Sequence, residues 1–197
     1  MSDDSLRAPE WDVAGGGPGG PRLTVRLVED GSGEPMAFCA SVTGADGTHL
    51  DGIGRGLYSD GRFYCDGEFS VPVPPGTVHV QASAGPCFLP LAGSVEVGPE
   101  EHVRIDGRLR RWVDLRERGW YCGDNHVHAQ HDSTADVQTD LAFAALQARA
   151  HGLDFLTEAR SNDSYERLAD LSRPDYQIAS SYEGRIGAFV GHFNTPG

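Results

Sequence analysis

The residues best suited to chemistry are two histidines separated by a single residue, in the motif G-D-N-H-V-H at positions 123–128. Alternate side chains of an extended strand share a face, so Asp124, His126 and His128 would project together. Neutral imidazole binds zinc, iron and manganese, and a carboxylate adds oxygen ligation and can bridge two ions. The spacing therefore predicts a divalent metal site with these three side chains as ligands.

The flanking sequence predicts a strand, a helix and a second strand. Residues 120–128 have the pattern of one strand and residues 153–157 that of another. Between them, apolar residues recur at i, i+4, i+7, i+8 and i+11, as on one side of a helix: Val137, Leu141, Ala144, Ala145 and Ala148. Such a unit belongs to a parallel sheet or an α/β barrel, and these folds carry their active sites at the carboxyl ends of the strands.

Capping residues predict where this helix begins and ends. Thr134 or Asp136 can cap its start, and Gly152 can end it. Further along the chain, residues 165–171 predict another helix and residues 187–193 another strand.

Three other polar residues lie near the histidine pair in the sequence. His131 and Asp132 follow where the chain leaves the strand, so both are candidates for catalytic proton transfer, and a solvated loop position explains them equally well. His151, at the predicted helix end, is interpreted as a cation that interacts favourably with the helix dipole rather than as a metal ligand.

The part of the chain before the motif has a different pattern. Residues 1–20, rich in glycine, predict a disordered leader. Residues 21–111 consist of short alternating apolar runs between turn-forming residues, which predicts an antiparallel β-sandwich. The motifs D-G-S-G-E-P-M, G-R-F-Y-C-D-G-E-F and V-P-V-P-P-G-T-V-H-V resemble the carboxypeptidase regulatory-like or transthyretin-like sandwich, a common accessory of hydrolases. This domain is expected to do no chemistry.

Composition limits the partners and the compartment. Sixteen Lys and Arg against 29 Asp and Glu give the 197 residues a formal charge of -13, which disfavours nucleic acid as a partner. An export signal is not visible, and no run approaches the roughly 18 apolar residues that span a bilayer, so we expect a soluble cytoplasmic protein without membrane contact. The cysteines are widely spaced, which favours free thiols over disulfides: Cys39, Cys65, Cys87 and Cys122.

Two segments together resemble a known family. The motif G-W-Y-C-G-D-N-H-V-H at 119–128 and G-L-D-F-L at 152–156 are similar to the opening of a PHP (polymerase and histidinol phosphatase) domain, closest to the CehA/McbA-type metallohydrolases. The resemblance covers residues 112–197. It implies a distorted α/β barrel with two or three divalent ions (Zn, Mn or Fe) held by His126 and His128. It further implies that Glu183 bridges the ions and that His192 is the next histidine ligand.

The resemblance also implies an activity. Members hydrolyse small-molecule substrates, so we expect hydrolysis of a phosphoester or of a carboxylic or carbamic ester by metal-activated water. Where the family has T-D-H, this chain has Thr157-Glu158-Ala159, so Glu158 would replace the aspartate ligand and nothing replaces the histidine. The chain ends at Gly197, before the strands and the D-x-H ligands that complete such a barrel.

The sequence thus predicts a mixed, multi-domain chain, with an antiparallel β-sandwich followed by an incomplete α/β domain of the PHP type. Two alternatives to a hydrolase stay open. One is a non-catalytic sandwich binding module joined to a truncated or degenerate metal-binding barrel. The other is a purely structural role, in which the histidine pair only satisfies hydrogen bonds.

Overall fold

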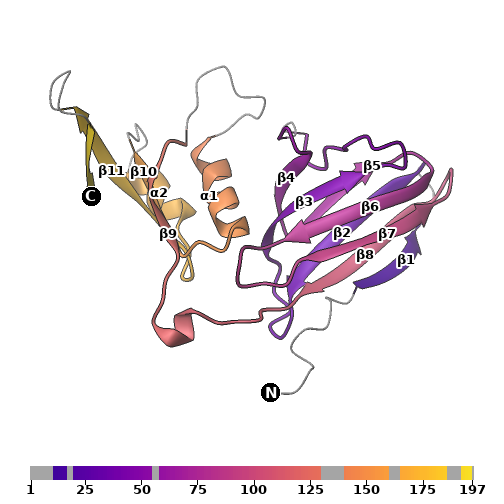
Figure 1. Cartoon of the computed structure of the whole chain (residues 1–197), viewed down its shortest axis with the longest axis horizontal. Helices are drawn as coiled ribbons and strands as arrows, with labels where there is room; N and C mark the ends of the chain where they lie inside the picture. Colours follow the sequence, from indigo (N-terminus) through magenta and orange to yellow (C-terminus); the bar gives the residue numbers. More distant parts are fainter. Residues whose placement is uncertain are drawn as a thin grey trace.

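A computed structural model describes residues 11–16, 20–54, 58–129, 140–159, 165–185 and 192–196; at 14–16, 165–167, 182–185 and 192–196 it describes the backbone alone (Figure 1). The described chain is rich in β-structure and contains three four-stranded sheets. Two of these sheets belong to the first part of the chain, and the third belongs to the second part.

The first two sheets pack face to face as a sandwich. One has the strand order β1 (Trp11–Gly16), β8 (His102–Leu109), β2 (Arg22–Glu29) and β5 (Glu68–Pro72). The other has the order β4 (Arg62–Asp66), β3 (Ala37–Thr43), β6 (Gly76–Ser83) and β7 (Leu91–Val97). Alternate residues of both sheets point inward and form one apolar core, which includes the fully buried Leu23, Val25, Leu27, Phe38, Val42, Val78 and Ile105.

Two sequence-based expectations about this sandwich are wrong. The pairing is not antiparallel throughout, because β2 and β8 run parallel; they lie far apart in the sequence and need no tight turn between them. Residues 11–16 are not a disordered leader, since β1 pairs along β8. The Trp11 ring packs over Gly93, where an added Cβ would lie 1.9 Å from it. The glycine content of the leader gave no sign of this anchoring aromatic contact.

The third sheet carries the residues of interest. After a short 3₁₀ turn, η2 (Arg116–Arg118), the chain forms β9 (Gly123–Val127), α1 (Leu141–Ala150), β10 (Phe155–Ala159), α2 (Tyr165–Leu171), β11 (Gln177–Arg185) and β12 (His192–Pro196). The strand order is β12-β11-β10-β9. β9, β10 and β11 are parallel, and β12 is antiparallel to β11. The predicted strand, helix, strand unit and the helix at 165–171 are confirmed.

Helix α1 begins later than its apolar stripe suggested. Its N-cap is Asp140, whose carboxylate accepts the N–H of Phe143 at 2.7 Å, so the prediction of Thr134 or Asp136 as the cap is wrong. The helix ends as predicted, because Gly152 follows the C-cap with a φ of 72°. No described helix has the length and apolarity needed to cross a bilayer.

The helix α1 lies between the sandwich and the third sheet (Figure 1). One side of it packs against the third sheet through Leu141, Ala144, Ala145 and Ala148. The other side packs against β3 and β4, where Phe143 and Ala150 join Ala37, Cys39 and Tyr64 in a small buried cluster. The molecule is therefore layered as two sheets, a layer that contains α1, and one sheet; Leu168 of α2 packs in the same cluster on the third sheet as α1 does.

The end of α1 is fixed to the sandwich by a pair of titratable side chains. Burial raises the pKa of Tyr64 to about 12, so its hydroxyl keeps its proton and can donate to Nε2 of His151 at 2.9 Å. Burial of the ring, together with the charge of Arg62, lowers the pKa of His151, which favours the neutral imidazole that accepts this bond. His151 thus contacts the sandwich and is not the helix-end cation that its position suggested.

The hydrogen bond between Tyr64 and His151 predicts that the fold loses stability at acidic pH. Because the folded state holds the pKa of His151 below that of the unfolded chain, the unfolded chain binds the proton more readily. The neutral His151 therefore adds to the free energy of unfolding in full above the pKa that it has in the unfolded chain. This stabilisation is lost as the pH falls from about 6.5 through the pKa of His151 in the folded state. Urea unfolding at pH 7.5 and 5.5 should show a larger loss of stability in the wild type than in His151→Gln. Equal losses would contradict this assignment.

Candidate metal centre

The strand that carries the histidines lies at one edge of the third sheet. It begins at Gly123, where an added Cβ would lie 2.2 Å from the ring of Phe155 on β10, so only glycine lets the two strands approach here. Asp124, Asn125 and His126 are exposed and His128 is half-buried. The two imidazoles thus stand at the carboxyl end of β9 and within reach of solvent.

The structure brings His126 and His128 together. Their Nε2 atoms lie 3.1 Å apart, and the two rings meet edge to face with centroids 4.8 Å apart. Two nitrogen ligands of a tetrahedral zinc ion with bonds of about 2.0–2.1 Å would lie roughly 3.3 Å from each other. The pair has nearly this separation, which is also that of a hydrogen bond from one ring N–H to the other ring nitrogen, so the distance is compatible with a shared ion and with the purely structural role.

Asp124 makes a local hydrogen bond within the strand. Its Oδ1 accepts the backbone N–H of His126 at 2.9 Å, a local bond within the strand. A bulge also interrupts the pairing of β9 with β10, since Leu156 pairs with Asp124 whereas Glu158 pairs with Val127. The regular alternation that would place Asp124 beside both histidines is therefore broken. Its part as a metal ligand stays a prediction.

Glu158 lies on the neighbouring strand and is only 4% exposed. It pairs with Val127 on one side and Ser180 on the other, near the carboxyl end of β10. Val127 packs against the apolar cluster beneath α1, so strand alternation directs His126 and His128 to the other face of β9. Among the side chains that the structure describes, no third His, Cys, Asp or Glu completes a metal-binding group with the pair.

Of the remaining predicted site residues, two are described by their backbone alone and two are outside the described residues. Glu183 pairs with Asn194, and His192 with Arg185, so both stand on strands of this sheet. Glu183 follows Ser181, the partner of the last residue of β10, and therefore lies toward the same carboxyl edge as the histidine pair. The side chains of Glu183 and His192 are outside the described residues.

The two residues predicted to transfer protons fall in the segment 130–139. His131 and Asp132 are therefore outside the described residues. They connect the end of β9 to α1, and their roles stay predictions.

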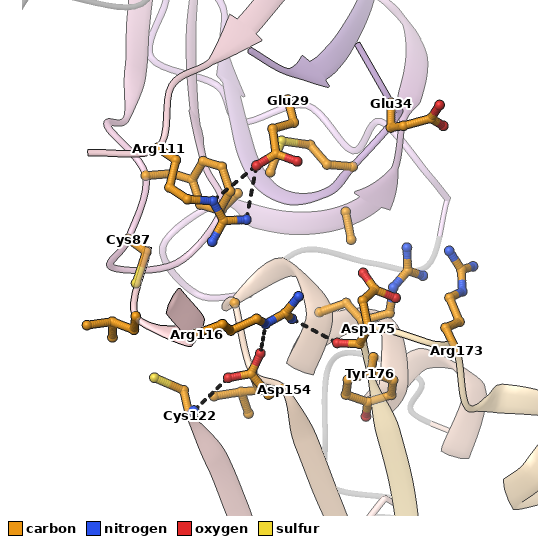
Figure 2. A pocket seen from close by; sticks show the side chains of 18 of the residues that line it. Glu29, Glu34, Cys87, Arg111, Arg116, Cys122, Asp154, Arg173, Asp175 and Tyr176 are labelled. Atoms are coloured by element: carbon orange, nitrogen blue, oxygen red, sulfur yellow. Dashed lines mark hydrogen bonds and ion pairs between the residues drawn. The ribbon is translucent and has the colours of Figure 1, made fainter. Parts of the chain in front are cut away.

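A second feature lies at the opposite edge of the sheet. A cleft of about 190 Å³ separates the sandwich from the amino ends of β10 and β11 (Figure 2). Four arginines line it, and each has a carboxylate partner: Arg111 with Glu29, Arg116 with Asp154, and both Arg149 and Arg173 with Asp66. Because its cations are paired, we interpret this cleft as a seam between the two parts of the chain.

Asp66 is the acceptor that joins the two parts across this seam. Burial opposes its ionisation, but hydrogen bonds and charge from Arg149 and Arg173 outweigh burial and hold the pKa of Asp66 below its ordinary value. Sequence analysis gave Asp66 no role, because its motif was used only for the resemblance to a sandwich fold. The only available signal was a charged residue next to a buried run, which is also common on exposed strand ends.

The seam also anchors the entry to β9. Asp154, whose side chain is 12% exposed, accepts the backbone N–H of Cys122 at 2.7 Å and pairs with Arg116 (Figure 2). The aspartate of the G-L-D-F-L segment thus ties together the linker, β9 and β10. It is a structural residue at the edge remote from the histidines.

The bonds of Asp154 predict that its replacement by alanine destabilises the fold more than its replacement by asparagine. Asp154→Ala leaves the N–H of Cys122 and the Nε–H of Arg116 without their acceptor, which should cost about 1–3 kcal/mol of unfolding free energy. Asp154→Asn keeps one acceptor oxygen and should cost less. Urea unfolding of both variants measures the difference. An Asn variant as unstable as the Ala variant would argue against an acceptor role.

Comparison with known proteins adds no assignment to this geometry. No protein-family model matches the chain, and no curated protein matches it either. The function must therefore be argued from the residues and their arrangement.

Proposed function

We propose that this chain carries part of a metal-dependent hydrolase site of the PHP type, acting on a phosphoester or on a carboxylic or carbamic ester. The observation that carries the proposal is the His126–His128 pair, with Nε2 atoms 3.1 Å apart at the carboxyl end of a parallel strand. This is the edge at which α/β folds build their active sites. The resemblance of the surrounding motifs to the PHP family supports the same reading.

The donor set fits divalent ions. Imidazole nitrogen suits Zn, Mn or Fe, and the two rings present their nitrogens at a separation compatible with one ion. Glu183 on β11 and His192 on β12, two and three strands along the sheet from β9, are proposed to supply further ligands, as the resemblance implies. Divalent ions bound here would supply Lewis acidity toward the scissile group and would acidify water.

The protein's own residues have separate proposed roles. His126 and His128 hold the ions, and the exposure of His126 leaves the site open to a substrate from solvent. His131 and Asp132 are proposed to exchange protons with the substrate or with water. A cation cluster would also let an anionic substrate approach a chain whose formal charge is -13, because bound ions dominate the local field.

One observation favours a second candidate, a metal-binding protein without turnover. Ala159, at the position where the family has histidine, is buried at 1% exposure in β10 and offers no donor atom. If that histidine is essential for turnover, ions could bind without hydrolysis. Metal binding and hydrolysis therefore have to be measured separately.

The first prediction concerns binding. Wild-type protein should bind Zn²⁺ in equilibrium dialysis, and His126→Ala with His128→Ala should weaken binding by more than about tenfold, since both nitrogens of the pair are lost. A matched control, His49→Ala with His79→Ala, removes the same number of histidines from the sandwich and should bind like the wild type. Indistinguishable dissociation constants for all three proteins would remove the basis of the proposal.

The second prediction concerns turnover. With Mn²⁺ or Zn²⁺ added, the wild type should hydrolyse one of three chromogenic esters, a phosphomonoester, a phosphodiester or a carboxylic ester, and a chelator should abolish the reaction. The double variant of the His126–His128 pair should show no metal-dependent rate above buffer. Zn²⁺ binding without hydrolysis of any ester would favour the non-catalytic candidate.

A further inference from the structure

We infer that the sandwich is a positioning element of the candidate metal centre, and that its contact with α1 sets the affinity of the His126–His128 pair for a divalent ion. The inference rests on the proposed function. It assigns the sandwich a part in the site that its sequence motifs do not suggest.

The first step is an apolar contact between the sandwich and α1. Phe143 and Ala150 of α1 are buried against Ala37, Cys39 and Tyr64 on the outer face of β3 and β4. The rings of Tyr64 and Phe143 meet edge to face, with centroids 6.2 Å apart. The outer face of this sheet therefore forms a second small core with α1.

Polar bonds fix the helix along this face. Arg149 donates to both carboxylate oxygens of Asp66 at 2.9 and 3.0 Å, a two-point contact that defines orientation as well as distance. Gln147 bonds to Tyr58, and His151 bonds to Tyr64. These bonds hold the second half of α1 against rotation and sliding.

The loop between β6 and β7 lies directly against the end of the helix at one point. Gly85 has a φ of 80°, and a Cβ added to it would lie 2.2 Å from the carbonyl oxygen of His151. Backbone therefore lies against backbone at this point. A side chain on residue 85 therefore requires the loop or the end of α1 to shift, which changes the contact between α1 and the sandwich.

The opposite side of α1 holds the residues that flank His128. Ala129, directly after it, is 2% exposed and packs with Leu141 and Ala144, and Val127, directly before it, packs on the same cluster. A displacement of α1 is thus transmitted to both neighbours of His128. Metal–ligand bonds tolerate changes of only about 0.2 Å, so a small displacement should weaken ion binding.

The test compares two glycines with the same backbone conformation. Gly85→Ala introduces the clash with α1, whereas Gly47→Ala introduces a Cβ at a φ of 83° with no atom within 4 Å. Both variants carry similar backbone strain in the sandwich. Zn²⁺ affinity of the full chain is measured by competition with a chromophoric chelator, together with His128→Ala as the reference for direct ligand loss.

We expect Gly47→Ala to keep the wild-type dissociation constant, and Gly85→Ala to weaken Zn²⁺ binding by at least about threefold and up to roughly thirtyfold. Equal affinities for Gly85→Ala and Gly47→Ala, with a clear loss in His128→Ala, would overturn the inference and leave the proposed function standing. Unchanged affinity in His128→Ala would overturn both.

A second pair keeps the inference testable if Gly85→Ala does not fold. Phe143→Leu removes the edge-to-face contact with Tyr64, and Phe69→Leu removes a similar contact with Phe63 inside the sandwich core, with centroids 4.9 Å apart. We expect Zn²⁺ binding to weaken in the first variant alone. Equal affinities in the two variants would count against the sandwich as a positioning element.

Discussion

The structure depends on one short helix that has to satisfy two apolar surfaces at once. Residues Leu141–Ala150 of α1 cover the third sheet on one side and the outer face of β3 and β4 on the other. Alanine at 144, 145, 148 and 150 allows this, because small side chains let a helix lie close to a sheet on either side. The sandwich and the third sheet therefore share a layer, and neither unit can bury that layer alone.

The two edges of the third sheet have different chemistry. At the amino edge, carboxylates and guanidinium groups are paired across the seam, with Asp154 and Asp66 as the central acceptors. At the carboxyl edge, His126 and His128 face each other and reach solvent. Paired charges suit a fixed interface, whereas accessible imidazole nitrogens suit a cation and a substrate. Stability and proposed chemistry are thus assigned to opposite ends of the same strands.

Sequence periodicity predicted the strand, helix, strand unit and the helix at 165–171, because these elements face a continuous apolar surface. It missed Phe143 as a core residue, since a single stripe assumes one core and α1 has two. It misplaced the helix start because several residues before Leu141 can cap, and the structure has Asp140 at this position.

The contact of His126 with His128 followed from strand alternation. The hydrogen bond of Asp124 to its own backbone and the bulge in β9 did not, because neither is visible in the apolar periodicity.

The central claim is that His126 and His128 bind one ion together. X-ray absorption at the zinc edge of the loaded protein tests it most directly, because it reports the atoms bound to the metal. The account predicts at least two nitrogen ligands at about 2.0–2.1 Å, with the outer-shell scattering of two imidazole rings. That scattering should decrease in the variant that lacks both histidines. A first shell of oxygen alone, or a spectrum unchanged in that variant, would contradict the claim.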